Sequence, residues 1–296
     1  MWKRMILLSL ILFSLCLCQK NAECGMQNAK FLEETAVLGF ADHLFDQEDY
    51  YRAIGEYQRF IFISEQDNEL NQKARFRVGL CYQRSKQLSA ALKYFKRLEI
   101  ELPKRIEPIR FEMARTYYLK GEFGQAIATF QSLTTSHLSD YSQYMLGWCY
   151  LKQMDWTKAG AAFGQVKSES SVYTFSQELS EIASKGANLP HKSPLTVGIM
   201  SLLFPGSGQA YLHRFGDGTF SMLFTLGTIY LGHHYLQQGD KAAGNILSGL
   251  GYMFYGGNVY GAAASAKLIN ASSGSNYLEQ IDRLDKERGV TIECWK

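Results

Sequence analysis

The sequence has no excess of charge of either sign. Its 296 residues include 31 lysines and arginines and 28 aspartates and glutamates, which give a formal net charge of +3. Such a balance excludes a dedicated nucleic-acid-binding protein, so we expect no nucleic-acid partner. Hydrophobic residues make up 46% of the chain and charged residues 20%, which excludes an intrinsically disordered protein.

Charge is nearly absent from residues 193–266. Only four of these 74 residues are charged, whereas the other 222 residues carry 55 of the 59 charges. Sixteen of the 26 glycines fall between Gly186 and Gly274. This division predicts a water-soluble half followed by a membrane half.

Recognisable catalytic and metal-binding motifs are also missing. Residues 205–209 are glycine-rich but lack the Lys-Ser/Thr pair of a phosphate-binding loop. His233 and His234 are adjacent, and adjacent side chains on a helix point about 100° apart, so the two cannot share one metal ion. No Ser/His/Asp set has a recognisable local context. We therefore expect a protein that is not an enzyme, with no catalytic residue, cofactor or metal site.

Residues 1–22 have the pattern of a secretory signal peptide. A short basic start, Met1–Arg4, precedes the almost purely apolar run Met5–Leu17, and polar residues follow. Such a run is too short to cross the ~30 Å hydrocarbon layer comfortably. We expect export with cleavage near Cys18 or Ala22. An uncleaved signal anchor and lipidation of a nearby cysteine are the alternatives.

A fourfold repeat covers the next part of the chain. In each repeat a small residue is followed after three positions by a large one, after twelve by alanine and after sixteen by an aromatic residue. The small residues, which start 38, 35 and 33 residues apart, are Ala41, Gly79, Ala114 and Gly147; the alanines are Ala53, Ala91, Ala126 and Ala159; the aromatic residues are Tyr57, Phe95, Phe130 and Phe163. A small side chain on one helix lets the alanine face of the next approach closely, so the pattern predicts stacked helical hairpins.

The spacing resembles that of the tetratricopeptide repeat, from about Lys30 to Val172. Repeat 2 also ends on the proline typical of the family, Pro103, whereas the other three repeats do not. The resemblance implies an all-α, tetratricopeptide-like solenoid of helical hairpins. With a capping helix at about Tyr173–Ser184, this domain should cover residues 30–185.

The resemblance also implies a concave partner-binding face, lined by the first helix of each repeat. An aromatic stripe flanked by basic residues there would suit a protein or peptide with carboxylate groups. The side chains expected to contact the partner are Phe45, Phe76, Arg84, Phe111, Arg115, Tyr118, Tyr144, Trp148 and Lys152, beside Leu38, Asp42, Leu80, Gln83 and Leu151. The alternative is that neighbouring repeats or the chain itself bury the aromatic residues. The carboxylate clamp of chaperone-binding relatives is missing, which disfavours chaperone tails as the partner.

Three apolar segments predict a small helical transmembrane domain over residues 195–270, after a linker at 186–194 and before a polar tail at 271–296. The segments are Leu195–Leu212, Thr219–Leu236 and Ile246–Ala266, of which the last two approach the length of a bilayer. Small residues at four-residue spacing predict close helix packing, either within the domain or between protomers of a homo-oligomer.

The second half also resembles a small bacterial membrane module marked by Pro-Gly-x-Gly-Gln-x-Tyr and two transmembrane helices. The residues that carry this resemblance are Pro205, Gly206, Gly208, Gln209 and Tyr211, with Gly257 and Gly261 in the second-helix signature. The family implies location in the bacterial inner membrane, with the lipid bilayer as a partner, but it defines no biochemical role.

Membrane topology stays open between two and three spans. The distribution of basic residues favours three spans with the repeats in the periplasm. A two-span hairpin would instead place Cys24 and Cys294 on the same exported side, where they could pair.

We therefore expect a membrane-anchored protein–protein interaction scaffold whose exported repeats bind a partner protein, in envelope biogenesis or secretion. The alternative is that the membrane module is the active part, as a channel, a lipid-binding element or a transporter accessory, and that the repeats regulate it. The scarcity of ionisable groups in the apolar segments argues against ion or proton translocation.

Overall fold

A computed structural model describes residues 32–64, 68–288 and 292 of the chain. These residues form helices and no strand, and they divide into two compact units. The first unit runs to Cys149 and includes residues 165–174; the second comprises Tyr150–Gly164 and the chain from Phe175 onward. The predicted signal peptide and the Cys24–Cys294 pair lie outside the described residues.

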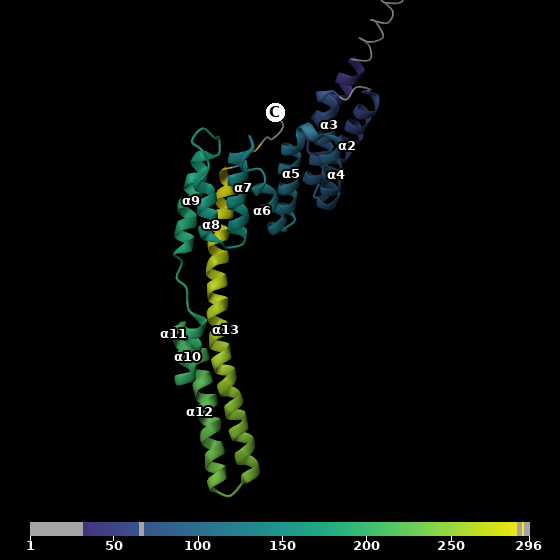
Figure 1. Ribbon diagram of the computed structural model, residues 1–296. Helices are drawn as coiled ribbons and strands as arrows, with labels where there is room; N and C mark the ends of the chain where they lie inside the picture. The colour runs from purple at the N-terminus through teal and green to yellow at the C-terminus, as the bar shows by residue number, and fades with distance from the viewer. Residues whose placement is uncertain (1–31, 65–67, 289–291, 293–296) are drawn as a thin grey trace, which may run out of the picture. The chain divides into compact units, whose positions relative to one another are not determined.

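The first unit is built from consecutive helical hairpins, which confirms the predicted all-α solenoid (Figure 1). A helix over residues 32–46 pairs with α2 (Tyr50–Ile63), and the following helices are α3 (Glu69–Arg84), α4 (Leu88–Glu101), α5 (Ile106–Leu119), α6 (Phe123–Gln131) and α7 (Ser139–Lys152), with a 3-10 turn at Pro103–Arg105. The chain enters the second unit near the end of α7 and continues into α8 (Trp156–Gly164).

The turn inside every hairpin uses the same backbone device. The residue after the first helix has a positive φ at Glu48 (60°), Lys86 (63°), Gly121 (80°) and Met154 (59°). At each turn two N–H groups donate back to the ends of the helix, as Lys86 does to the Gln83 carbonyl and Gln87 to the Tyr82 carbonyl. This is the Schellman arrangement, which satisfies the last carbonyls of a helix. Three of the four positions lack the glycine that would predict it from the sequence.

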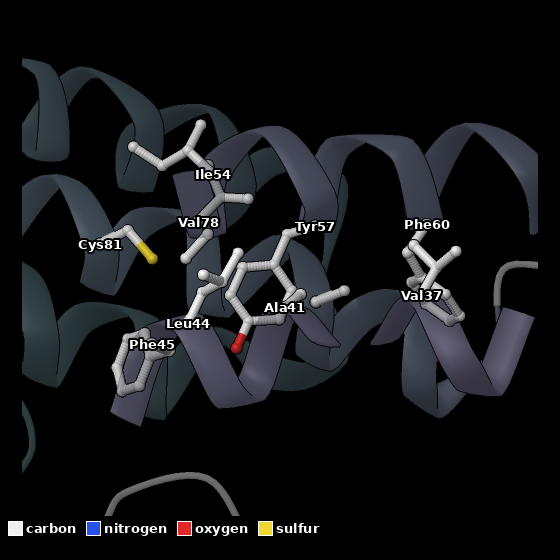
Figure 2. Close-up of a cluster of buried hydrophobic side chains, with 11 residues drawn as sticks. Val37, Ala41, Leu44, Phe45, Ile54, Tyr57, Phe60, Val78 and Cys81 are labelled. Carbon is white, nitrogen blue, oxygen red and sulfur yellow. The ribbon is translucent and has the colours of Figure 1, made fainter. Parts of the chain in front are cut away.

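The repeated small residues and aromatic residues form the core of the first unit (Figure 2). Ala41, Ala53 and Tyr57 are fully buried, and the Tyr57 hydroxyl donates a 2.5 Å hydrogen bond to Asp42 Oδ1. Burial raises the pKa of Tyr57 far above its usual value, so this hydroxyl stays a donor. In repeat 2, a Cβ on Gly79 would overlap the Phe95 ring, which explains the small residue there.

The second unit continues with α9 (Tyr173–Ala187), α10 (Pro194–Leu203), α11 (Ser207–Tyr211), α12 (Phe215–Gln237) and α13 (Lys241–Arg288). Figure 1 shows α12 and α13 as an antiparallel hairpin, with the C-terminal end of α13 beside α8. The 48 residues of α13 run through the polar residues after position 270, which the sequence pattern did not assign to the same helix.

Glycines bring the backbones of α12 and α13 together. A Cβ on Gly232 would lie 2.5 Å from Ser248 Oγ, and one on Gly244 would lie 2.5 Å from Leu236 Cγ. Gly251 is similarly close to Ile229. The predicted packing through Gly244 and Ser248 therefore occurs within the hairpin of one chain.

The structure does not support the predicted transmembrane domain at 195–270. In the part of the chain that the structure describes, no helix combines the length and the apolar character needed to cross a membrane. Length is not the reason for α12 and α13, which have 23 and 48 residues. Their apolar residues are interrupted by glycine, threonine, tyrosine and asparagine, as at Thr228 and Asn258. The predicted two or three membrane spans are likewise not supported in the described residues.

Candidate functional site

Most of the aromatic residues predicted to line the partner-binding groove belong to the core instead. Five of them have at most 3% of their surface exposed: Phe45, Phe76, Phe111, Tyr144 and Trp148. Phe76 packs against Phe95, and Phe111 against Phe130, at ring-centroid distances of 5.9 and 5.3 Å. The large residue of the first helix therefore fills the space beside the aromatic residue of the second. This is the burial alternative that the sequence left open, and these rings are not available to a partner in this arrangement.

Two arginines cover one of the buried rings. The guanidinium carbons of Arg77 and Arg84 each lie 4.5 Å from the centroid of the Phe45 ring. Cations over an aromatic face are attracted by its negative π-surface. Within the described ranges neither guanidinium has a carboxylate partner, and Arg84 is exposed. Arg84 is one of the predicted groove residues, whereas Arg77, which lies seven residues earlier on the same face of α3, was not predicted.

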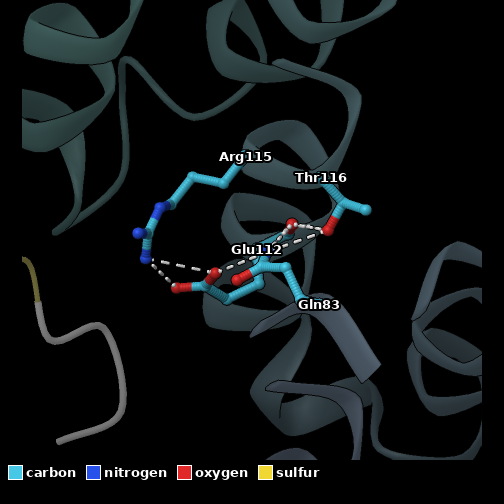
Figure 3. Close-up of polar contacts among 4 residues, drawn as sticks. All are labelled: Gln83, Glu112, Arg115 and Thr116. Carbon is cyan, nitrogen blue, oxygen red and sulfur yellow. Dashed lines mark hydrogen bonds and ion pairs between the residues drawn. The ribbon is translucent and has the colours of Figure 1, made fainter. Parts of the chain in front are cut away.

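A buried carboxylate links repeats 2 and 3 near this position (Figure 3). Glu112 is only 2% exposed, and its Oε2 accepts a 3.1 Å hydrogen bond from Gln83 Nε2. Arg115 Nη1 lies 3.0 Å from the Glu112 Oε1, and Gln83 Nε2 also donates to the Thr116 hydroxyl at 2.9 Å. A buried charge needs such partners, because an unpaired carboxylate is costly to desolvate. Gln83 thus joins α3 to α5 and holds adjacent hairpins in register, whereas Arg115 pairs with Glu112 on the same helix.

The remaining predicted groove residues are also occupied within the chain. Tyr118 packs edge-on against Phe123 at 5.7 Å. Leu151 is fully buried, while Leu38 and Leu80 are partly buried against the core of repeat 1. Lys152 Nζ lies 2.6 Å from both carboxylate oxygens of Asp282, near the C-terminal end of α13.

The C-terminal end of α13 packs on the last repeat and the following helix within the second unit. The rings of Tyr277 and Trp156 are 5.6 Å apart, and the Tyr277 hydroxyl donates to the Ile182 carbonyl at 3.0 Å. Ile281 is 1% exposed. Two turns further on, Arg288 pairs with Glu178 at 3.0 Å. The chain itself therefore supplies the ligand of Lys152, one of the predicted partner-binding residues.

We expect the charge reversal Asp282→Lys to loosen this end of α13, because two ammonium groups would replace an ion pair that is partly screened by solvent. The cost should be about 1 kcal/mol, seen as faster amide hydrogen exchange over residues 277–288. The reciprocal double variant, Lys152→Asp with Asp282→Lys, should restore slow exchange. Arg283→Glu, which disrupts only an exposed pair with Glu279, is the control. Unchanged exchange in Asp282→Lys would contradict the role of the pair.

The residues of the Pro-Gly-x-Gly-Gln-x-Tyr pattern form a second cluster, at the break between α10 and α11. Gly206 has φ +89°, which favours glycine, and its N–H donates to Asn258 Oδ1 at 3.1 Å. Asn258 Nδ2 donates to the Ser201 carbonyl at 3.1 Å, and Gln209 Nε2 donates to Asn258 Oδ1 at 3.0 Å. One asparagine of α13 thus satisfies the backbone groups that the helix break frees. A Cβ on Gly208 would overlap Ser201 and the Val197 carbonyl, so this glycine is also required by packing.

The other residues of this pattern differ in their surroundings. Tyr211 is 43% exposed and carries Lys192 Nζ 4.5 Å from its ring centroid. Gly257 and Gly261 have no atom within 4 Å of a Cβ position, so nothing in the described chain packs against them. Gly257 and Gly261 were predicted from the second-helix signature, but no role was predicted for Asn258, whose amide both donates and accepts hydrogen bonds at the helix break.

Among the described residues of the first unit, Cys81 and Cys149 are free cysteines, and both are buried. Burial raises the pKa of the Cys81 and Cys149 thiols to about 12, so they are inert at neutral pH. This agrees with their place in the repeat cores rather than in a reactive site.

Two parts of the sequence match models of the tetratricopeptide repeat, over residues 38–106 and 141–170. The chain contains tetratricopeptide repeats. No curated protein matches the sequence at a significant level.

The repeat chain is also similar to several solved structures. A putative kinesin light chain with tetratricopeptide-like repeats from Podosopora anserina is 14% identical, with a TM-score of 0.43 over 52% of this chain and 86% of that one. The apo form of RapI is 18% identical, with a TM-score of 0.43 over 76% and 75% of the two chains. A tetratricopeptide repeat protein from Parabacteroides merdae is 15% identical, with a TM-score of 0.42 over 78% and 98%.

Proposed function

We propose that this protein is a non-enzymatic interaction scaffold whose repeats bind an acidic segment of a partner protein. The supporting observation is the pair Arg77 and Arg84. Both guanidinium groups lie on the Phe45 ring, and the described residues offer neither of them a carboxylate. Arginine donates in a planar fork that matches a carboxylate, so an aspartate or glutamate of the partner is the natural ligand. Tetratricopeptide repeats in general bind proteins or peptides, which fits this chemistry.

The proposal predicts that the charge reversal Arg84→Glu abolishes capture of the partner by the full chain. The control is Lys96→Glu, an equal change of charge at an exposed position of α4. Crosslinking and affinity purification followed by mass spectrometry should find proteins retained by the natural chain and by the control but lost from Arg84→Glu. An identical set of captured proteins from all three would contradict the proposal.

The finer part of the proposal concerns location. The helices α10, α12 and α13 expose many large apolar side chains, including Leu203, Phe204, Leu223, Tyr252 and Met253. Water would contact this surface unfavourably, and charge is scarce around it. We propose that lipid of a bacterial inner membrane covers it, and that the repeats lie on the periplasmic side in an envelope-biogenesis or secretion assembly.

Two measurements test this location. The double variant Leu223→Glu with Tyr252→Glu should release the full chain from membranes during fractionation, whereas Phe62→Glu, at an equally exposed site of the first unit, should not. A reporter active only outside the cytoplasm, fused after Lys185, should be active. If neither variant released the chain from membranes, the proposed attachment would be contradicted. An inactive reporter would contradict export of the repeats.

A further inference from the structure

A pocket opens between α12 and α13 beside the helix-break cluster. It encloses about 290 Å³. Its wall is aromatic, formed by Phe220, Phe224 and Phe254, with ring centroids 4.1 Å apart for the first pair and 5.9 Å for Phe224 and Phe254. Arg214 and Asp217 line it at the start of α12. The pocket is therefore polar at one end and apolar along its length.

Two glycines of α13 leave this pocket open. Gly257 and Gly261 both line it, and a Cβ on either would meet no other atom within 4 Å. The glycines at Gly232, Gly244 and Gly251 differ, because the facing helix there leaves no space. Glycine inside a helix costs about 1 kcal/mol relative to alanine. Packing within the chain does not account for that cost at Gly257 and Gly261, nor at Gly227, Gly249 and Gly256, which are equally open. Gly257 and Gly261 differ from these three in lining the pocket, where they leave room for a ligand along the backbone.

A buried hydroxyl in the pocket has no hydrogen-bond partner. Thr225 lines the pocket, is fully buried, and its Oγ1 makes no hydrogen bond. The other threonines of the same helix behave differently. The hydroxyls of Thr219 and Thr228 donate to the carbonyls four residues earlier, at 2.9 and 2.5 Å. An unsatisfied buried hydroxyl costs about 1–3 kcal/mol, so a ligand oxygen that accepts a hydrogen bond from Thr225 would be stabilising here.

The polar end of the pocket offers guanidinium donors to an anion, while the ion pair with Asp217 offsets the charge of Arg214. Arg214 Nη1 donates to Ser265 Oγ at 2.6 Å and Nη2 pairs with Asp217 at 2.6 Å. A guanidinium has five N–H donors, so further donors remain for a ligand, and the two contacts fix its orientation. Phosphate is well matched to such a group.

We propose that this pocket binds one anionic phospholipid. The phosphate of the lipid lies at Arg214, and an ester carbonyl accepts a hydrogen bond from the Thr225 hydroxyl. An acyl chain lies along the backbone of residues 257–261 and contacts the wall of phenylalanine rings. The inference rests on the lipid contact proposed above for this hairpin but goes beyond it, since it assigns a specific site to one molecule. It does not depend on the partner of the repeats.

The test uses the full chain in phosphatidylcholine nanodiscs that contain phosphatidylglycerol with a photoreactive acyl chain. After illumination, mass spectrometry should find the label concentrated on the pocket residues Phe220, Phe224, Met253 and Phe254. Gly257→Leu should fill the pocket and lower this labelling about tenfold. Gly256→Leu is the matched control, because Gly256 is equally open but lies outside the pocket lining.

Competitors separate the parts of the ligand. Unlabelled phosphatidylglycerol should displace the label; its ether-linked analogue, which lacks the carbonyl, and diacylglycerol, which lacks the phosphate, should each do so more weakly. Thr225→Val should abolish the difference between the ester and the ether.

Three results would overturn the site. The first is equal labelling of both glycine variants, and the second is labelling spread evenly over exposed side chains such as Leu203 and Ile246. The third is a change from dimer to monomer in Gly257→Leu, which would mean that a second copy of the chain contacts Gly257 and Gly261. If the natural chain did not associate with membranes at all, the lipid contact proposed above for α10, α12 and α13 would be refuted instead.

Discussion

Replacing Gly79 by leucine should unfold the first unit under conditions in which the natural chain is stable. The new side chain would have to occupy the volume of the fully buried Phe95 ring, which a Cβ alone already overlaps. Overpacking of this kind costs about 3 kcal/mol or more, a large part of the 5–15 kcal/mol by which domains are stable. Urea unfolding followed by far-ultraviolet circular dichroism should show an early transition that carries the helical signal of the repeats.

The matched control is Gly55→Leu in α2. This glycine is exposed, and a Cβ there would meet no atom within 4 Å. Leucine forms helix better than glycine, so the variant should be more stable by about 0.5–1 kcal/mol. A midpoint shift of the same sign and size for both variants would show that close packing of Gly79 against Phe95 does not hold repeat 2 together.

Asn258→Leu should open the break between α10 and α11. The asparagine accepts from the Gly206 N–H and from Gln209, and it donates to the Ser201 carbonyl. Leucine can do none of this and would leave the Gly206 N–H and the Ser201 carbonyl without partners, each at about 1–3 kcal/mol. Gln209 Nε2 would keep only its bond to the backbone carbonyl of residue 258. Amide hydrogen exchange at Gly206 and Gly208 should accelerate about a hundredfold or more, since that factor corresponds to only ~2.7 kcal/mol.

The same substitution at Asn245, which is exposed on α13, gives the comparison for this effect. It adds the same apolar side chain to the same helix without removing a buried hydrogen bond, so exchange at the break should stay slow. If both asparagine variants left exchange at Gly206 unchanged, the cluster would not be what stabilises the break.

The repeat pattern predicted the helical hairpins well, because it records packing that recurs along the chain. Ala41, Gly79 and their counterparts are small since a neighbouring ring or helix needs the space, and the sequence shows this directly through the spacing. The groove was harder to predict. The sequence does not show whether a large aromatic residue on the first helix of a hairpin faces a partner or the next helix. Phe76 and Phe111 face the next helix, where they pack against Phe95 and Phe130.

The apolar half shows a similar limit. The apolar segment Leu195–Leu212 was predicted from the sequence, and the structure divides it into α10 and α11 on either side of Pro205–Gly206. Composition did not predict which glycines are packed and which are open. Gly244 and Gly257 look alike in the sequence, yet one touches the facing helix and the other borders the pocket.

The sequence by itself thus determined the local architecture: that the chain is helical, which faces are small or apolar, and that the hairpins repeat. These properties depend on neighbours three to sixteen positions apart. Only the tertiary structure decided which groups are used and which stay available. It joined Lys152 to Asp282, 130 residues later, and Asn258 to Gly206, 52 residues earlier. Among the described residues it left the Arg84 guanidinium over Phe45 without a carboxylate, and the Thr225 hydroxyl without a hydrogen bond. Contacts over such separations leave no periodic trace in a single sequence, because each is made only once.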